Sequence, residues 1–249
     1  MLSLSFFLIA LIYAMAGFGG GSSYIAVLTL IGFSYALIPP LALICNLLVV
    51  SSSSFNFIRY KHLEWPLFWP FFAGSVPMAF IGGSIPISKD VFLLLLGVCL
   101  LFAGAQLMFS LRQVDLPLAK LPPWYVNVLL GALLGLLAGL SGIGGGIFLS
   151  PLLLGLRWGQ PKPVATAASL FILANSLAGL AGQWLKHGDL SPVLAWWPLF
   201  LAVVAGGQLG SLIGAGKLPQ GWVRGVTAAL VLVASGRLLW PYLQPLLVR

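Results

Sequence analysis

Long apolar stretches fill most of the chain, and polar or charged residues are confined to short segments between them. Residues 1–58 contain no acidic residue, lysine, arginine or histidine, and the first charged side chain is Arg59. Because about 20 apolar residues cross the hydrocarbon core of a bilayer, and lipid leaves backbone groups without partners, these stretches are predicted to be membrane helices. They fall at 2–16, 22–38, 39–58, 65–87, 90–111, 123–140, 147–156, 163–185, 191–216 and 219–243. The first stretch lacks the basic residues that precede a signal-peptide core, so we expect it to be a retained span.

Two sequence patterns occur twice, 125 residues apart, which indicates an internal repeat. Ala16-Gly17-Phe18-Gly19-Gly20-Gly21 recurs as Ser141-Gly142-Ile143-Gly144-Gly145-Gly146, and Lys61-His62-Leu63-Glu64 recurs as Lys186-His187-Gly188-Asp189. The predicted fold is therefore an all-α polytopic membrane protein of about 8 transmembrane helices in two pseudosymmetric repeats. Repeat 1 is 1–115 and repeat 2 is 122–249, joined by a proline-rich linker within one membrane domain.

The distribution of basic residues bears on how the two repeats are oriented. If the segment 1–38 is one kinked span, the repeats are parallel and the twelve basic residues divide 7 to 5 between the two faces. If it folds back on itself, the repeats are inverted and the division is 8 to 4. Basic residues favour the cytoplasmic face, so we expect inverted repeats with the N-terminus outside. The eight cytoplasmic residues are then Arg59, Lys61, Arg112, Lys120, Arg157, Lys162, Lys217 and Arg224.

Each GxGGG motif lies inside an apolar stretch, where three consecutive glycines disfavour a helix. Close helix packing is one interpretation of such glycines, and Gly131, Gly135 and Gly139 fit it well. We favour the other, in which the first helical segment of each repeat is broken at GxGGG. Unwound backbone at membrane depth is tolerated where it is buried in protein or lines a wet cavity, and paired interruptions point to a transport site.

A helix that restarts after such a break presents free N–H groups and the positive end of its dipole, which together can hold an anion. Serine hydroxyls next to the glycines could add donors, and two asparagines stand well inside their spans. The candidate substrate-binding residues are Gly19, Gly20, Gly21, Ser22, Ser23, Asn46, Gln106, Ser141, Gly144, Gly145, Gly146, Asn175 and Arg237. For the other polar residues in the spans, Ser51–Ser54, Asn56, Ser169, Ser176, Gln183 and Gln208, we expect interhelical hydrogen bonds. For Arg237, snorkelling to the interface is the alternative.

Composition excludes several other classes of function. The chain is 60% hydrophobic and 6% charged, and its net charge of +8 is spread over short loops rather than clustered as in a nucleic-acid-binding protein. No carboxylate lies deep in a span, which argues against a proton relay and a divalent-cation site. Cys45 and Cys99 form no ligand cluster, and no hydrolase or ATP-binding motif is found. We therefore expect no enzyme activity, no cofactor and no metal.

The paired AGFGGGSS and SGIGGGIFLSP motifs and the proline-initiated helices PPLALICN and KPVATAAS resemble the sulfite exporter TauE/SafE family over the whole chain. The resemblance implies a multi-pass protein of the bacterial inner membrane that exports a small sulfur-containing anion, such as sulfite or sulfoacetate. A carrier for another solute and a non-transporting membrane scaffold are the alternatives. For the assembly of the protein, a homodimer is one alternative. For His62 and His187, beside Lys61 and Lys186, we expect interfacial anchoring, and the alternative is a surface patch that attracts anions.

Overall fold

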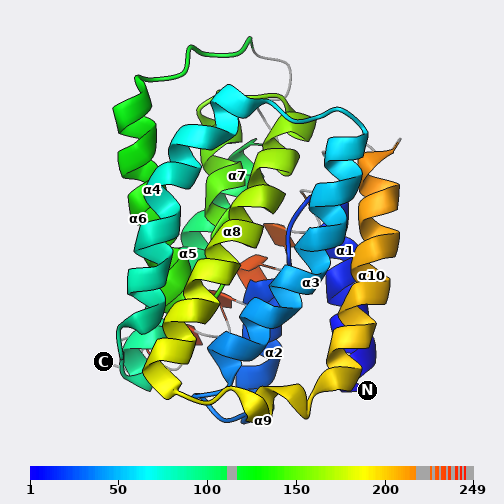
Figure 1. Ribbon diagram of the computed structural model, residues 1–249, viewed down its shortest axis with the longest axis vertical. Helices are drawn as coiled ribbons and strands as arrows, with labels where there is room; N and C mark the ends of the chain where they lie inside the picture. Colours follow the sequence, from blue (N-terminus) through cyan, green and yellow to red (C-terminus); the bar gives the residue numbers. More distant parts are fainter. Residues whose placement is uncertain are drawn as a thin grey trace.

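The structure is a computed structural model, and it describes residues 1–110 and 117–216 together with isolated positions between 225 and 244. All regular elements in the described part are α-helices (Figure 1). They are α1 (Leu2–Met15), α2 (Gly21–Leu30), α3 (Ile38–Arg59), α4 (Trp65–Ser84), α5 (Lys89–Ser110), α6 (Trp124–Ser141), α7 (Gly146–Gly155), α8 (Pro161–His187), α9 (Ser191–Leu194) and α10 (Trp197–Ala215).

Five of these helices, α3, α4, α6, α8 and α10, are long and apolar enough to cross a membrane. α1, α2 and α7 are apolar but shorter, with 14, 10 and 10 residues. At 1.5 Å per residue, a 10-residue helix is about 15 Å long and reaches only halfway across the hydrocarbon core. The described part therefore confirms a polytopic α-helical protein, in which short helices join full-length ones.

The predicted boundaries hold within a few residues except at two segments. The predicted 22–38 helix ends at Leu30, and turns follow, with Gly32 at a positive φ of 72°, before α3 begins with Pro39 and Pro40 in its first turn. Proline favours the first turn because its missing N–H would have no partner there. The predicted 191–216 helix is divided into α9 and α10, and α10 also has a proline, Pro198, in its first turn. Most of the predicted 219–243 helix lies outside the described residues.

The two long helices α3 and α8 pack against each other in the middle of the molecule, with their chains running in opposite directions (Figure 1). On one side α4 packs on both α6 and α8, and on the other α10 packs on both α1 and α3. α4 runs from the upper to the lower end of the view, and α10 runs from the lower to the upper end. The 31–37 turn lies at the lower end, where Tyr35 Oη donates to the Ile87 carbonyl at 3.0 Å.

Glycines make the two outer helix pairs unusually close. A Cβ added at Gly131 or Gly135 of α6 would meet backbone atoms of α4 at 2.2 Å. On α10, a Cβ at Gly210 or Gly214 would meet backbone carbonyls of α1 at 2.1 Å. These glycines let neighbouring membrane helices approach closely, as expected for small residues. Helix packing therefore explains the glycines of α6 and α10 that lie away from the breaks.

Candidate functional site

The first glycine motif interrupts the chain between α1 and α2. α1 ends at Met15, and Gly17 and Gly20 adopt positive φ values of 79° and 86° before α2 begins at Gly21. Only glycine takes such values at low cost, which explains the residue type at both positions. The Gly17 position also packs on the backbone of α8, since a Cβ there would lie 2.6 Å from the Ala165 carbonyl oxygen.

The second motif interrupts the chain between α6 and α7 in the same way. α6 ends at Ser141, and Gly142, Gly144 and Gly145 have φ values of 69°, 80° and 83° before α7 begins at Gly146. Both predicted interruptions are therefore present. In each motif the last glycine, Gly21 or Gly146, is already the first helical residue.

Asn46, on α3, lies between the two interruptions and contacts both. Its Nδ2 donates to the backbone carbonyl of Ile143 in the second break at 2.8 Å. On the other side, a Cβ added at Gly19 or Gly21 would collide with the same amide group, so the absence of side chains at the first break makes room for it. The side chain is fully buried, and its Oδ1 has no hydrogen-bond partner among the described residues.

The backbone N–H groups of residues 19–22 at the first break and of residues 143–147 at the second have no acceptor among the described residues, whereas those of Gly17, Phe18 and Gly142 donate to the preceding helix. After the first break, the first N–H groups with an acceptor are those of Ser23 and Tyr24, which donate to the Gly20 carbonyl. After the second, Phe148 and Leu149 donate to the Gly145 carbonyl. The preceding donors, from the glycines to the first helical residues, carry the partial positive charge of a helix N-terminus. Two such ends buried close to one amide form a strongly electropositive environment without any charged side chain.

α8 adds further buried polar atoms next to the second break. Ser176 lies against Gly144, since a Cβ at Gly144 would be 2.7 Å from its Oγ. Both the Ser176 hydroxyl and the two polar atoms of Asn175 are fully buried without a partner among the described residues. Burying unpaired polar groups costs stability, about 1–3 kcal/mol each, so their presence together points to a ligand or water that they bind.

The serines near the breaks are engaged within the protein. The hydroxyls of Ser23 and Ser22 bond to Tyr13 Oη on α1, at 2.8 Å and 3.5 Å. Ser141 Oγ donates to the Leu137 carbonyl of its own helix at 2.6 Å. Sequence reasoning did not identify Tyr13, although its place three residues before Ala16 puts it one helical turn from the break.

Two predicted residues are not part of this cluster. Gln106 lines a separate, largely apolar pocket between α5, α6 and α7, with Cys99 and Phe148. Arg237 lies outside the described residues. The cluster around Asn46 consequently consists of the two glycine breaks together with Ser176, and Asn175 adjoins Ser176 on α8.

Comparison with known proteins fits this arrangement of broken helices. The profile described as Sulfite exporter TauE/SafE matches residues 2–238. The chain belongs to the sulfite exporter TauE/SafE family. It is 36% identical over 242 residues to the probable membrane transporter protein y4hK of Sinorhizobium fredii, covering 96% of this chain and 97% of the relative. It is 26% identical over 230 residues to the probable membrane transporter protein YunE of Bacillus subtilis, covering 81% and 82%.

No solved structure matches this TauE/SafE chain significantly. The family and the named relatives identify the protein as a multi-pass membrane transporter. The cluster around Asn46 joins both glycine breaks and contains buried polar atoms without a partner among the described residues, which makes it the candidate transport site.

Proposed function

We propose that this transporter is a secondary carrier that exports a small sulfur-containing anion, such as sulfite or sulfoacetate, across the bacterial inner membrane. The anion would be held between the two glycine breaks by backbone N–H groups, with Asn46, Asn175 and Ser176 as neutral donors. One observation carries the proposal: a single buried amide bridges two breaks whose N–H groups lack acceptors in the described part of the chain.

Neutral donors suit a transported anion better than a fixed cation would. An arginine in the site would bind an oxyanion tightly as a charge-assisted pair and slow its release. N–H groups and helix dipoles contribute partial charges, so binding stays reversible. The membrane potential then favours export, because 100 mV, negative inside, is worth about 2.3 kcal/mol for a monovalent anion.

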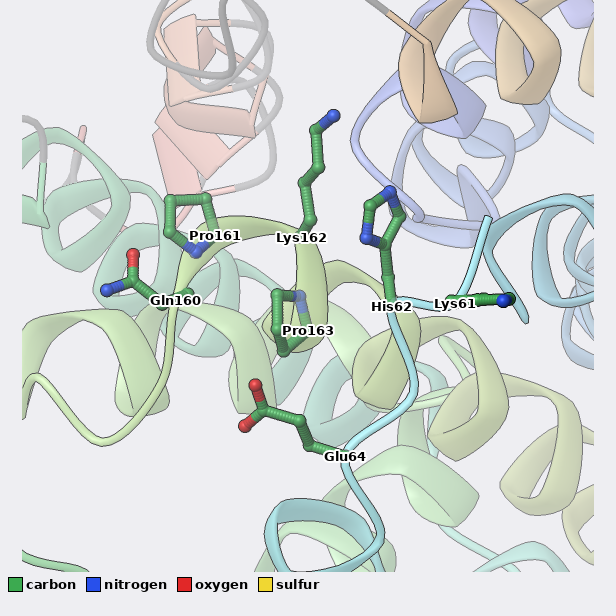
Figure 2. Close-up of a pocket in the computed structure, with 7 residues that line it drawn as sticks. All are labelled: Lys61, His62, Glu64, Gln160, Pro161, Lys162 and Pro163. Carbon is green, nitrogen blue, oxygen red and sulfur yellow. The ribbon is translucent and has the colours of Figure 1, made fainter. Parts of the chain in front are cut away.

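We further propose that the two repeats are inverted, with the upper end of Figure 1 in the cytoplasm. The equivalent helices α3 and α8 run in opposite directions, as do α4 and α10. Arg59 and Lys61 follow α3 at the upper end, and Lys162 begins α8 there (Figures 1 and 2). Lys120 and Arg157 belong to the same end, where the Ala119 N–H donates to the Arg157 carbonyl at 2.8 Å. This agrees with the distribution of basic residues from which the orientation was predicted.

Flux assays in proteoliposomes test the proposal directly. The purified protein would be reconstituted, and efflux of labelled sulfite, sulfoacetate, sulfate and a neutral control such as taurine would be measured with an imposed potential. We expect saturable efflux of one of the three anions that increases when the potential is negative inside the vesicle, on the side that the anion leaves. Flux of the neutral compound alone would favour a carrier for another solute, and no flux of any compound would favour a membrane scaffold.

A further inference from the structure

A pocket outside the candidate transport site lies at the upper end of the molecule, where the loop after α3 meets the start of α8 (Figure 2). Its volume is about 510 Å³, enough for a small hydrated anion. The lining residues are Lys61, His62, Glu64, Gln160, Pro161, Lys162 and Pro163.

The basic groups of this pocket are not neutralised by its one carboxylate. Lys162 and His62 point in the same direction, whereas Glu64 points away from both (Figure 2). No ion pair joins Glu64 to a basic residue in the described part of the chain. Lys162 Nζ donates to the Gly216 carbonyl at the end of α10, at 3.0 Å, and an ammonium group has two more protons to donate. The pocket thus keeps unused donor capacity and a positive potential.

His62 is held in the pocket with a free ring nitrogen. Its Nε2 is buried and has no hydrogen-bond partner among the described residues. Partial burial, and secondarily the charge of Lys162, lower the pKa of this imidazole, which is further sign that Lys162 makes the pocket positive. An oxyanion bound between the two would favour the protonated imidazole, whose Nε2–H could then donate to it.

The backbone that presents these groups is strained. Lys61 has a φ of 60°, and it ends α3 by donating its N–H to the Ile58 carbonyl at 2.8 Å. A left-handed conformation costs a non-glycine residue roughly 1–2 kcal/mol, and such strain often marks functional positions. At the turn after α8, the left-handed residue is Gly188, with a φ of 72°, so there the left-handed conformation falls on a glycine rather than on a lysine.

The pocket is joined to the first glycine break through one turn of α8. Ala165, three residues after Lys162 and about 4.5 Å further along the helix axis, packs directly on Gly17. Thr166 Oγ1 bonds to the Lys162 carbonyl at 2.9 Å, and Ser169 continues the polar residues toward the centre with a hydrogen bond to Ser54 at 3.3 Å. An anion released from the pocket would therefore be at the start of a polar seam that runs between α3 and α8.

We propose that this pocket is a second, peripheral site that binds a small oxyanion between His62 and Lys162, with the charge of Lys61 at its edge, and loads it into the transport path. The loading role rests on the proposed function, whereas the binding site does not. A lipid phosphate has the same oxyanion chemistry, so the experiments separate a free anion from a headgroup.

Histidine NMR tests binding without any transport assay, because the chain has only two histidines. In the full-length protein in nonionic detergent, added sulfate should shift the His62 ring signals saturably and leave His187 unchanged. Lys162→Gln should abolish the shift and Lys61→Gly should weaken it. Equal shifts of both histidines, no shift of either, or an unchanged shift in both variants would overturn the site.

Nanodiscs distinguish the two sources of oxyanion. We expect sulfate to shift His62 equally in discs of phosphatidylcholine with and without phosphatidylglycerol. If phosphatidylglycerol alone shifts His62 and sulfate cannot compete, the pocket is a lipid anchor and the proposal is wrong.

Flux kinetics then test the loading role. Lys61→Gly removes a cation and also relieves strain, so it should keep the protein folded while raising the KM for the transported anion about tenfold at an unchanged maximal rate. Lys186→Gln, which removes a cation at the opposite end, should change neither. An unchanged KM in Lys61→Gly would refute loading and leave the proposed function standing. Sulfate binding at His62 without flux of any sulfur oxyanion would refute the proposed function instead.

Discussion

The two glycine breaks share a sequence pattern but have different surroundings. Gly19 and Gly21 of the first break lie against the amide of Asn46. At the second break, Gly144 and Gly146 both lie against the aliphatic side chain of Ile172, and Gly144 also lies against Ser176 Oγ and Asn46 Nδ2. The first break thus packs on one amide from its own repeat, whereas the second packs on an aliphatic side chain together with two polar groups.

The difference follows from the residue that each central helix contributes. Beside the second break, Ile172 takes the place that Asn46 takes beside the first. Ser169, which the aligned proline-initiated helices pair with Asn46, donates to the Thr166 carbonyl at 2.9 Å. Asn46 consequently serves both breaks, and a symmetric backbone carries an asymmetric set of donors.

The largest expected effect comes from valine at the left-handed glycines of the two breaks. Gly20→Val or Gly145→Val places a β-branched residue at a φ of 86° or 83° and drives its Cβ to within 3.0 Å of Ile9 or Phe171. We expect flux to be abolished with membrane insertion intact, at a cost of about 1–3 kcal/mol from backbone strain before the clashes are counted. Flux and unfolding in detergent measure both.

The matched control for those variants is Gly188→Val, which has a φ of 72° but no atom within 4 Å of the added Cβ. It should lose stability through strain alone and retain flux. Unchanged flux in both break variants would refute a role for the breaks in transport.

A smaller effect is expected from the amide that joins the breaks. Asn46→Leu keeps the size of the side chain but leaves the Ile143 carbonyl without its donor, so stability should fall by about 1–3 kcal/mol and flux should fall with it. Asn56, on the same helix, donates to Ser211 at 2.8 Å and is remote from both breaks. Asn56→Leu should therefore lower stability and leave the KM unchanged. If Asn56→Leu changed the KM as much as Asn46→Leu does, the effect of Asn46 would be purely structural.

At Asn175 we expect a substitution to change stability in the opposite direction. Its side chain has no partner among the described residues, so Asn175→Leu removes two unsatisfied polar atoms and should stabilise the protein by about 1 kcal/mol. Flux should nevertheless decrease, because the donors that meet the anion are lost. Thermal unfolding and flux of the same preparation check both signs. A stabilised variant with full flux would exclude Asn175 from the path.

The smallest effect is expected at Ser141, which the sequence suggested as a donor to the anion. Its hydroxyl is bonded back to the Leu137 carbonyl, a local interaction of little net value to the helix. Ser141→Ala should change stability by less than about 0.5 kcal/mol and leave the KM unchanged. A raised KM would mean that the hydroxyl turns toward the anion during transport.

Helix positions and both interruptions could be predicted from the sequence because they depend on local properties. Apolar length sets the spans, and consecutive glycines end α1 and α6. Helix propensity, however, does not predict the effect of replacing these glycines. Helix propensity alone favours alanine over Gly20 by about 1 kcal/mol, but the φ of 86° reverses that expectation.

The depth of Asn46 in its span predicted a place in the site, but its contact with both breaks could not be predicted, because it joins residues 97 positions apart in the sequence. Gln106, also predicted for the site, lines a separate pocket away from the cluster around Asn46, so its role in binding stays a prediction. Which polar residues meet is decided by the crossing of α3 and α8, which is a tertiary property.

The most direct test of the account asks whether an anion reaches the centre of the molecule. Ser176→Cys, in a variant with Cys45 and Cys99 replaced by alanine, places a thiol beside Gly144. The reaction with an anionic, membrane-impermeant methanethiosulfonate would be measured with and without sulfoacetate. Lys120→Cys, at an exposed position in the loop before α6, serves as the control. The account predicts that Cys at 176 reacts and that sulfoacetate slows its reaction but not that at 120. A thiol at 176 that is unreactive, or equally reactive with sulfoacetate present, would contradict it.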